Sequence, residues 1–256
     1  MGKIIAVSIG FIYASIISLI PPNGLAAKEI NNAREYKVCM RLAKSDPQKA
    51  FDTALNWHGF GGGDAANHCI AVALIGLGQH KEAAGRLESL ALNAKQPADI
   101  KAGLLAHAAQ AWILAGKSLR AEAVLTAALK LMPNEAALLI DRAQARAGQN
   151  NYADAIEDLT RAIKYKNHMV DAFVFRASAY RHLNKLEAAL SDVERALKIQ
   201  HDNPEGLLER GNLRRLRQDY NGARKDWLTL MQSSPKSPAA EAARLSLERM
   251  DLKPNR

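Results

Sequence analysis

Small and large apolar residues recur along this chain at intervals of 34 residues. Two series consist of small residues: Ala121, Ala155, Ala189 and Ala223 in one, and Ala109, Ala143, Ala177 and Gly211 in the other. Two more series carry large apolar side chains: Leu105, Leu139, Phe173 and Leu207 in one, and Leu125, Leu159, Val193 and Trp227 in the other. Small residues mark places where helices approach closely, and the large residues fill the space between them. The pattern therefore predicts two packed helices in each 34-residue unit.

Turn-forming residues separate these predicted helices. Within units they are Gly116-Lys117, Gly148-Gln149-Asn150, Asn184-Lys185 and Gln218-Asp219, and between units they are Pro133-Asn134, Asn167-His168, Asp202-Asn203-Pro204 and Ser234-Pro235. A single unit of this kind cannot bury its apolar face, so neighbouring units must stack. The sequence therefore predicts an all-α solenoid.

The repeat resembles the tetratricopeptide repeat, which has the same 34-residue period and small residues at matching positions. The positions that carry the resemblance include Ala177, Tyr180, Ala189, Ala196, Gly211, Tyr220, Ala223 and Pro235. Arg146 and Arg214 depart from the family pattern, which commonly has an aromatic residue there. The resemblance implies a right-handed α-solenoid of about six units.

This comparison also suggests how the chain is divided. We expect atypical units over 27–101, with a four-residue insertion near Ala94 to Asp99, and four regular units over 102–237. A capping helix and tail over 238–256 would cover the last apolar face with a polar-backed helix.

In tetratricopeptide solenoids the first helix of each unit lines a concave face, so the resemblance implies a peptide groove. Its predicted residues are Ala106, Ile140, Val174 and Leu208 as an apolar row, Gln110, Gln144, Ser178 and Asn212 as an amide and hydroxyl row, and Ile113, Arg181 and Arg215 beyond them. Amides and hydroxyls can hydrogen-bond an extended backbone. The alternative is that these residues simply pack against the neighbouring unit.

Three arginines repeat in the same register, each followed 16 residues later by an aspartate. The pairs are Arg142 with Asp158, Arg176 with Asp192, and Arg210 with Asp226. A phosphate site would have no use for the matched acid, so we expect salt bridges that fix the two helices of each unit.

The N-terminus has the features of a secretory signal peptide over residues 1–26. Lys3 precedes an apolar run from Ile4 to Ile20, a helix-breaking segment follows at Pro21-Pro22-Asn23-Gly24, and small residues follow at Ala26-Ala27. We therefore expect a periplasmic protein, with an uncleaved membrane anchor as the alternative.

Two cysteines, Cys39 and Cys69, are present, and in an oxidising compartment they would form one disulfide. Together with His58 and His68 they could also be drawn as a zinc site, but the spacing fits no recognised zinc finger. We expect no metal and no cofactor.

The chain carries a formal net charge of +9, which favours an acidic partner, an anionic membrane surface or nucleic acid. The basic residues gather near the end of the repeats, at Arg210, Arg214, Arg215, Arg217, Arg224 and Lys225. Export argues against nucleic acid, so we expect a protein or peptide partner, with nucleic acid or an anionic surface as a distant alternative.

No catalytic motif stands out, and the repeats leave little room for a catalytic domain. We therefore expect a non-catalytic scaffold, not an enzyme, that binds a partner segment in envelope assembly. An accessory subunit of a periplasmic enzyme, of the kind that acts on peptidoglycan or in cytochrome maturation, is the alternative.

Overall fold

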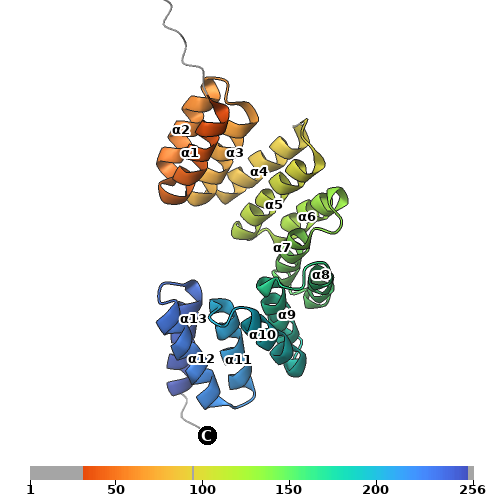
Figure 1. Cartoon of the computed structure of the whole chain (residues 1–256), viewed down its shortest axis with the longest axis vertical. Coiled ribbons are helices and arrows are strands. Elements are labelled where there is room, and N and C mark those ends of the chain that lie inside the picture. Colours follow the sequence, from red (N-terminus) through yellow and green to blue (C-terminus); the bar gives the residue numbers. More distant parts are fainter. Residues whose placement is uncertain (1–30, 94, 253–256) are drawn as a thin grey trace, which may run out of the picture. The chain divides into compact units, whose positions relative to one another are not determined.

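The computed structural model describes residues 31–93 and 95–252, and within that part of the chain it contains thirteen α-helices and no strand. The helices are α1 (Asn32–Ser45), α2 (Pro47–Gly59), α3 (Gly63–Gly76), α4 (His80–Asn93), α5 (Ala98–Leu114), α6 (Ser118–Leu131), α7 (Ala136–Ala147), α8 (Tyr152–Tyr165), α9 (Val170–His182), α10 (Leu186–Ile199), α11 (Pro204–Leu216), α12 (Tyr220–Ser233) and α13 (Pro238–Asp251). Figure 1 shows them as successive helical hairpins, with α13 at the end of the series. The predicted all-α solenoid is confirmed.

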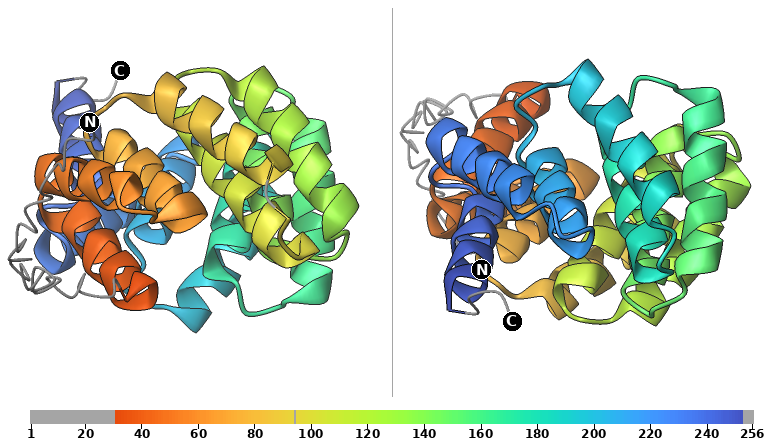
Figure 2. Two further views of the ribbon diagram at one scale, coloured as in Figure 1. Left: turned by 90° about the horizontal axis from the view of Figure 1, so that it is seen from above. Right: turned by 90° about the horizontal axis from the view of Figure 1, so that it is seen from below.

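The packing of these helices divides them into two sets. Each odd-numbered helix from α1 to α11 packs on the even-numbered helix that follows it. Odd-numbered helices of neighbouring pairs also touch, α5 with α7, α7 with α9, and α9 with α11. Both views in Figure 2 show the pairs following one another in the order of the chain. The odd-numbered helices α5, α7, α9 and α11 thus share one surface, which we call the first-helix face.

In the five pairs from α3–α4 to α11–α12, the turn inside the pair contains one residue in the left-handed region. These residues are Gly78, Gly116, Asn150, Asn184 and Gln218, with φ between 57° and 75°. The last four are 34 residues apart, so the period of the sequence is also a period of backbone conformation. Glycine and asparagine adopt this conformation at little cost and commonly end helices this way. The turn signals in the sequence therefore mark the ends of the first helices.

The core of each hairpin is formed by the repeating small and large apolar residues. Ala109, Ala143 and Ala177 are at most 1% exposed, and the large residues 16 positions later in each unit are equally buried. The last unit differs, because it pairs Gly211 with Trp227, whose ring is fully buried. A larger side chain on the second helix is matched by the loss of a methyl group on the first, as close packing requires.

In the three hairpins α7–α8, α9–α10 and α11–α12, the repeating arginine and aspartate form a bidentate salt bridge. Arg142 donates from Nε and Nη2 to the two Asp158 oxygens at 2.8 and 2.7 Å. Arg176 and Arg210 bind Asp192 and Asp226 in the same way.

The two arginines that depart from the family pattern belong to this arrangement. Arg146 Nη1 lies 2.9 Å from Asp158 Oδ2, and Arg214 Nη1 lies 2.7 Å from Asp226 Oδ2. At the equivalent position of the middle unit the aromatic ring of Tyr180 lies 5.9 Å from the Arg176 guanidinium. An arginine thus takes the place of the aromatic residue by binding the same buried carboxylate.

The N-terminal helices are linked covalently by a Cys39–Cys69 disulfide between α1 and α3, with the Cα atoms 6.2 Å apart. Both cysteines are therefore unavailable to a metal, and no group of three or more potential metal ligands occurs in the described residues. Helix α5 begins at Ala98, so the domain boundary expected at residue 102 falls inside a helix. Much of the predicted insertion lengthens the N-terminal end of α5, which has 17 residues.

The predicted signal peptide over 1–26 lies outside the described residues. Within 31–93 and 95–252, no helix combines the length and the apolar character that a membrane crossing requires.

Candidate functional site

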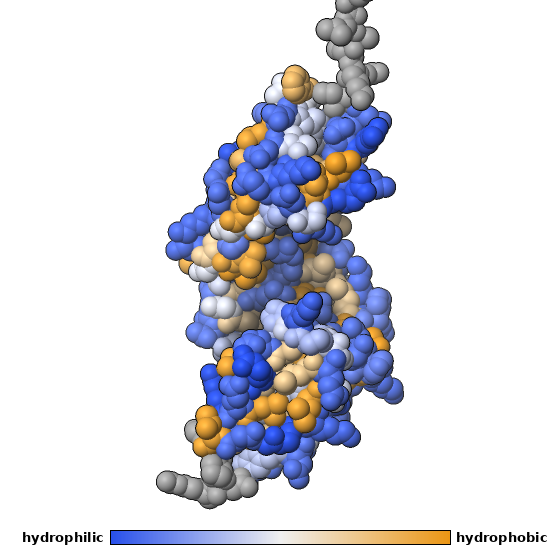
Figure 3. All heavy atoms as spheres, turned by 90° about the vertical axis from the view of Figure 1, so that its left-hand side faces the viewer, coloured by the Kyte–Doolittle hydropathy of each residue, from blue (hydrophilic) through white to orange (hydrophobic). Residues whose placement is uncertain are grey.

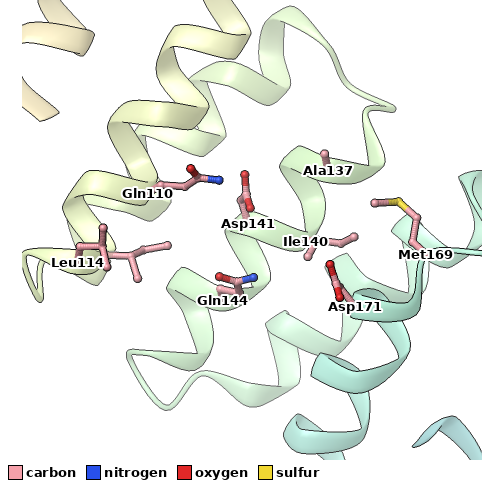
Figure 4. Close-up of a pocket in the computed structure, with 9 residues that line it drawn as sticks. Gln110, Leu114, Ala137, Ile140, Asp141, Gln144, Met169 and Asp171 are labelled. Carbon is pink, nitrogen blue, oxygen red and sulfur yellow. The ribbon is translucent and has the colours of Figure 1, made fainter. Parts of the chain in front are cut away.

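A cavity of about 460 Å³ opens on the first-helix face between α5, α7 and the start of α9. It is lined by Gln110, Ile113 and Leu114 from α5, by Ala137, Ile140, Asp141 and Gln144 from α7, and by Met169 and Asp171. Figure 4 shows the Gln110 and Gln144 amides and both carboxylates around the same opening. The cavity therefore combines apolar walls with hydrogen-bonding groups from three repeats, as ligand sites commonly do.

Asp141 is the most perturbed group in this cavity. Burial raises the pKa of its carboxyl to about 6, and a hydrogen bond with the Gln110 side chain lowers it by a smaller amount. In Figure 4 the Gln110 amide nitrogen points toward Asp141. Within 31–93 and 95–252, neither Asp141 nor Asp171 forms an ion pair shorter than 4 Å. A partly desolvated carboxylate without a cation is costly, and it favours a ligand that supplies positive charge.

Four residues of the predicted groove line this cavity: Gln110, Ile113, Ile140 and Gln144. The rest of the predicted apolar row is packed between helices. Val174 is only 5% exposed, while Ala106 and Leu208 are partly buried against the core. None of these three residues lines the cavity.

The predicted basic end of the groove needs correction, because Arg181 is already paired. Its Nε donates to Glu209 Oε1 at 2.6 Å, and its Nη2 donates to Ser178 Oγ at 3.2 Å. Glu209 lies on α11 and is buried. Asn212 is half-buried and Arg215 is exposed, and neither lines the cavity. Arg181 is thus neutralised within the chain and is not a free positive charge on this face.

Sequence reasoning missed five residues of the cavity: Leu114, Ala137, Asp141, Met169 and Asp171. Asp141 was missed by a single position, because the groove was assigned to the residue next to it, Ile140. Ile140 is only 5% exposed, but its side chain and that of Asp141 both line the cavity. The signal available in the sequence was the row His107, Asp141, Phe175 and Glu209, whose members are 34 residues apart and include three titratable groups.

Four of the six residues in the basic cluster near the C-terminal repeats form ion pairs. Arg210 and Arg214 share Asp226, Arg217 lies 3.6 Å from Glu187, and Arg224 binds Asp251. Only Arg215 and Lys225 of the six form no ion pair with any residue in 31–93 or 95–252. Two of these ion pairs, Arg217 with Glu187 and Arg224 with Asp251, are exposed to solvent and therefore weak.

A second polar cluster joins the first three odd-numbered helices. Tyr36 on α1 hydrogen-bonds His68 Nδ1 at 2.7 Å, and His68 Nε2 lies 3.0 Å from His107 Nδ1 on α5. The two imidazoles are stacked with their centroids 5.2 Å apart. Burial, followed by the neighbouring His107, lowers the pKa of His68 to about 4. The pair is therefore neutral near pH 7 and connects the disulfide-linked helices to the regular repeats.

Large exposed apolar side chains do not form an obvious docking surface. Phe60, Leu92 and Leu119 are more than 70% exposed but belong to three different segments. On the face shown in Figure 3, hydrophilic residues predominate and hydrophobic residues form separate patches. The polar cavity is therefore the best-defined candidate for recognition.

Comparison with known proteins supports the repeat assignment. The tetratricopeptide-repeat family model matches residues 114–164 and 140–204. No curated protein matches the sequence. The described helices are similar to several solved structures, of which three illustrate the range.

MamA from Desulfovibrio magneticus RS-1 is 18% identical, with a TM-score of 0.56 over 68% of this chain and 97% of that one. A chain of the APC/C hetero-tetramer Cut9-Hcn1 is 14% identical, with a TM-score of 0.66 over 83% of this chain and 42% of that one. YrrB, described as a tetratricopeptide-repeat protein with an unusual peptide-binding site, is 14% identical, with a TM-score of 0.50 over 70% of this chain and 90% of that one. At these identities the likeness shows the fold alone. The family match identifies residues 114–204 as tetratricopeptide repeats, and the solved structures share the fold of the described helices.

Proposed function

We propose that this protein is a non-catalytic scaffold that binds an extended segment of a partner protein on its first-helix face. The observation that carries the proposal is the cavity between α5, α7 and α9, with two amides and two carboxylates at its edge. Amide side chains can hydrogen-bond both the carbonyl and the N–H groups of an extended peptide. The fold supports this reading, because repeat solenoids use extended surfaces of this kind for binding.

Binding explains the lining of the cavity better than catalysis does. Its polar groups are two carboxylates and two amides, and its remaining lining residues, including Met169, are apolar. The lining contains no hydroxyl, thiol or imidazole, so its only groups capable of nucleophilic or base chemistry are the two carboxylates. The two carboxylates lie beside apolar walls that suit side chains of a peptide.

We also propose that the protein is exported and acts in envelope assembly, with the accessory subunit of an envelope enzyme as the second candidate. The signal-like segment over 1–26 and the disulfide between Cys39 and Cys69 both support an oxidising compartment. Intact mass measurement of protein from the native envelope tests this. A mass that lacks about 26 residues, with both thiols protected until reduction, is expected; full length with free thiols would refute export.

The binding proposal can be tested by photo-crosslinking of bound peptides to the protein. Nonapeptides are selected from a random library on the purified protein, and their affinities are measured by fluorescence anisotropy. A photo-reactive residue at position 144 should then crosslink the bound peptide, whereas one at Glu157, an exposed residue of α8, should not. Crosslinking from position 157 alone would place binding on the other side of the hairpins and refute the proposed site.

A further inference from the structure

The salt bridge between Arg181 and Glu209 provides a template for what the cavity can bind. Arg181 on α9 donates from Nε and Nη2 to the two Glu209 oxygens on α11, at 2.6 and 3.2 Å. This is a bidentate contact between the first helices of neighbouring repeats. Planar guanidinium and carboxylate groups match each other in this geometry, which a single ammonium charge cannot reproduce.

Repeat symmetry places a carboxylate without an arginine two units earlier. A step of 68 residues back from Glu209 leads to Asp141, and the same step from Arg181 leads to Ile113. Asp141 therefore occupies the position of Glu209, while an apolar side chain occupies the position of the arginine. In the unit between them the same two positions are Ala147 and Phe175, which carry no charge.

The space left by the missing arginine coincides with the cavity. Ile113 and Asp141 both line the cavity of about 460 Å³, together with Asp171 and Gln144. Asp171 provides a second carboxylate at the same opening, and Gln144 provides an amide oxygen (Figure 4). No ion pair in 31–93 or 95–252 neutralises either aspartate. The site thus has acceptors and room for a flat cationic group, but no cation of its own.

We propose that this cavity binds the guanidinium group of an arginine in the partner segment, with Asp141 as the bidentate acceptor. The inference rests on the proposed function, because it specifies the chemistry of the segment bound on the first-helix face. Asp171 adds negative charge at the opening, and the Gln110 amide orients the Asp141 carboxylate. The partner's arginine thus binds Asp141 in the way that Arg181 binds Glu209 within the chain.

The test compares peptides that differ only in one side chain. In a nonapeptide selected on the full chain, each position is replaced in turn by arginine, lysine, glutamate or citrulline, which has the shape of arginine without its charge. Affinities are measured by fluorescence anisotropy. At one position arginine should bind at least about tenfold more tightly than citrulline, the range expected for a charged hydrogen-bonded pair.

Three variants assign this preference to the cavity. Asp141→Asn should remove the advantage of arginine over citrulline, and Glu157→Gln, an equivalent neutralisation on α8, should leave it unchanged. Ile113→Arg supplies the missing arginine within the chain, so it should weaken the arginine peptide about tenfold or more. If that variant folds poorly by circular dichroism, Asp141→Asn still decides the question.

The outcomes separate the inference from the proposed function. Peptides that crosslink from position 144 but show no preference for arginine would overturn the inference and leave the function standing. A preference that survives Asp141→Asn, or one for glutamate, would also overturn it, and equal affinity for lysine would refute the bidentate contact. Failure of every selected nonapeptide to crosslink from position 144 would instead overturn the proposed function.

Discussion

Replacement of Gly211 by alanine should have opposite effects on stability depending on the residue at position 227. A Cβ atom at Gly211 would lie 2.6 Å from Trp227 Cδ1 and would also overlap the indole nitrogen. Trp227 is fully buried, so its ring cannot move aside without disturbing the contact between α11 and α12. The other regular units tolerate alanine here because they carry leucine or valine 16 residues later.

The magnitudes follow from two opposing effects. Overpacking of a dense core costs about 1–3 kcal/mol, whereas alanine in place of glycine inside a helix gains up to about 1 kcal/mol. Gly211→Ala should therefore destabilise the protein by about 1–2 kcal/mol. After Trp227→Leu the ring is gone, and the same substitution should stabilise by up to about 1 kcal/mol. The coupling free energy between the two sites should thus be about 2 kcal/mol.

Trp227→Leu by itself should cost less than the volume of the ring implies. The deletion leaves a cavity, but it also removes the Trp227 Nε1 donor, which is buried without a hydrogen-bond partner. Such an unsatisfied donor costs about 1–3 kcal/mol, which offsets part of the loss in packing.

The assay is urea denaturation of the unaltered protein, the two single variants and the double variant. Unfolding is monitored by circular dichroism at 222 nm, because tryptophan fluorescence differs between proteins with and without Trp227. Hydrogen exchange in α11 and α12 reports the local free energy of opening if the repeats do not unfold together. Ala143→Gly in the hairpin of α7 and α8 is the control and should destabilise by about 1 kcal/mol. A Gly211→Ala change with the same sign in both backgrounds would refute the packing argument.

Three further predictions concern charge and crosslinks. Asp158→Asn should destabilise the protein by about 3–5 kcal/mol, and Asp192→Asn by less, because Asp158 is the buried partner of two arginines and Asp192 of one. Urea midpoints of the two variants measure the difference. The folded-state pKa of His68 is about 4, below its ordinary 6.5. The contribution of the neutral imidazole to the free energy of unfolding is therefore fully present above pH 6.5 and is lost as the pH falls through 4, by about 3 kcal/mol in total. His68→Gln should flatten this part of the pH profile of stability. Reduction of the disulfide between Cys39 and Cys69 should cost about 3–4 kcal/mol, seen as a lower melting temperature in dithiothreitol that a Cys39→Ser variant does not show.

The fold could be predicted from the sequence because its structural residues repeat. The small residues at Ala109 and Ala143, and the turn residues at Gly116 and Asn150, each specify a close contact or a backbone conformation in every unit. Local requirements of this kind do not depend on distant parts of the chain. The start of α5 at Ala98 was missed because the extra residues join a helix rather than a loop, and nothing in their composition distinguishes the two.

The candidate site was only partly predictable, because it depends on how side chains in different repeats meet. Gln110, Ile113, Ile140 and Gln144 were identified from the position of the first helices. Whether Arg181 is free depends on Glu209, which lies in another repeat. Periodicity describes each helix by itself, so it cannot show which charges of one repeat are neutralised by the next.

The same repeat symmetry gives a physical reason to look for function at Asp141. The aspartates at positions 158, 192 and 226 each have an arginine 16 residues earlier, and each pair forms a salt bridge between the two helices of its hairpin. In these hairpins the carboxylate and its cation therefore occur together. Asp141 breaks the corresponding pattern on the first-helix face, since its arginine position is Ile113 while its carboxylate remains. An unpaired carboxylate whose pKa is raised by burial lowers the stability of the folded chain as the pH rises through 6. A bound cation would reverse that loss, so binding of an arginine segment should weaken below pH 6, where Asp141 becomes protonated.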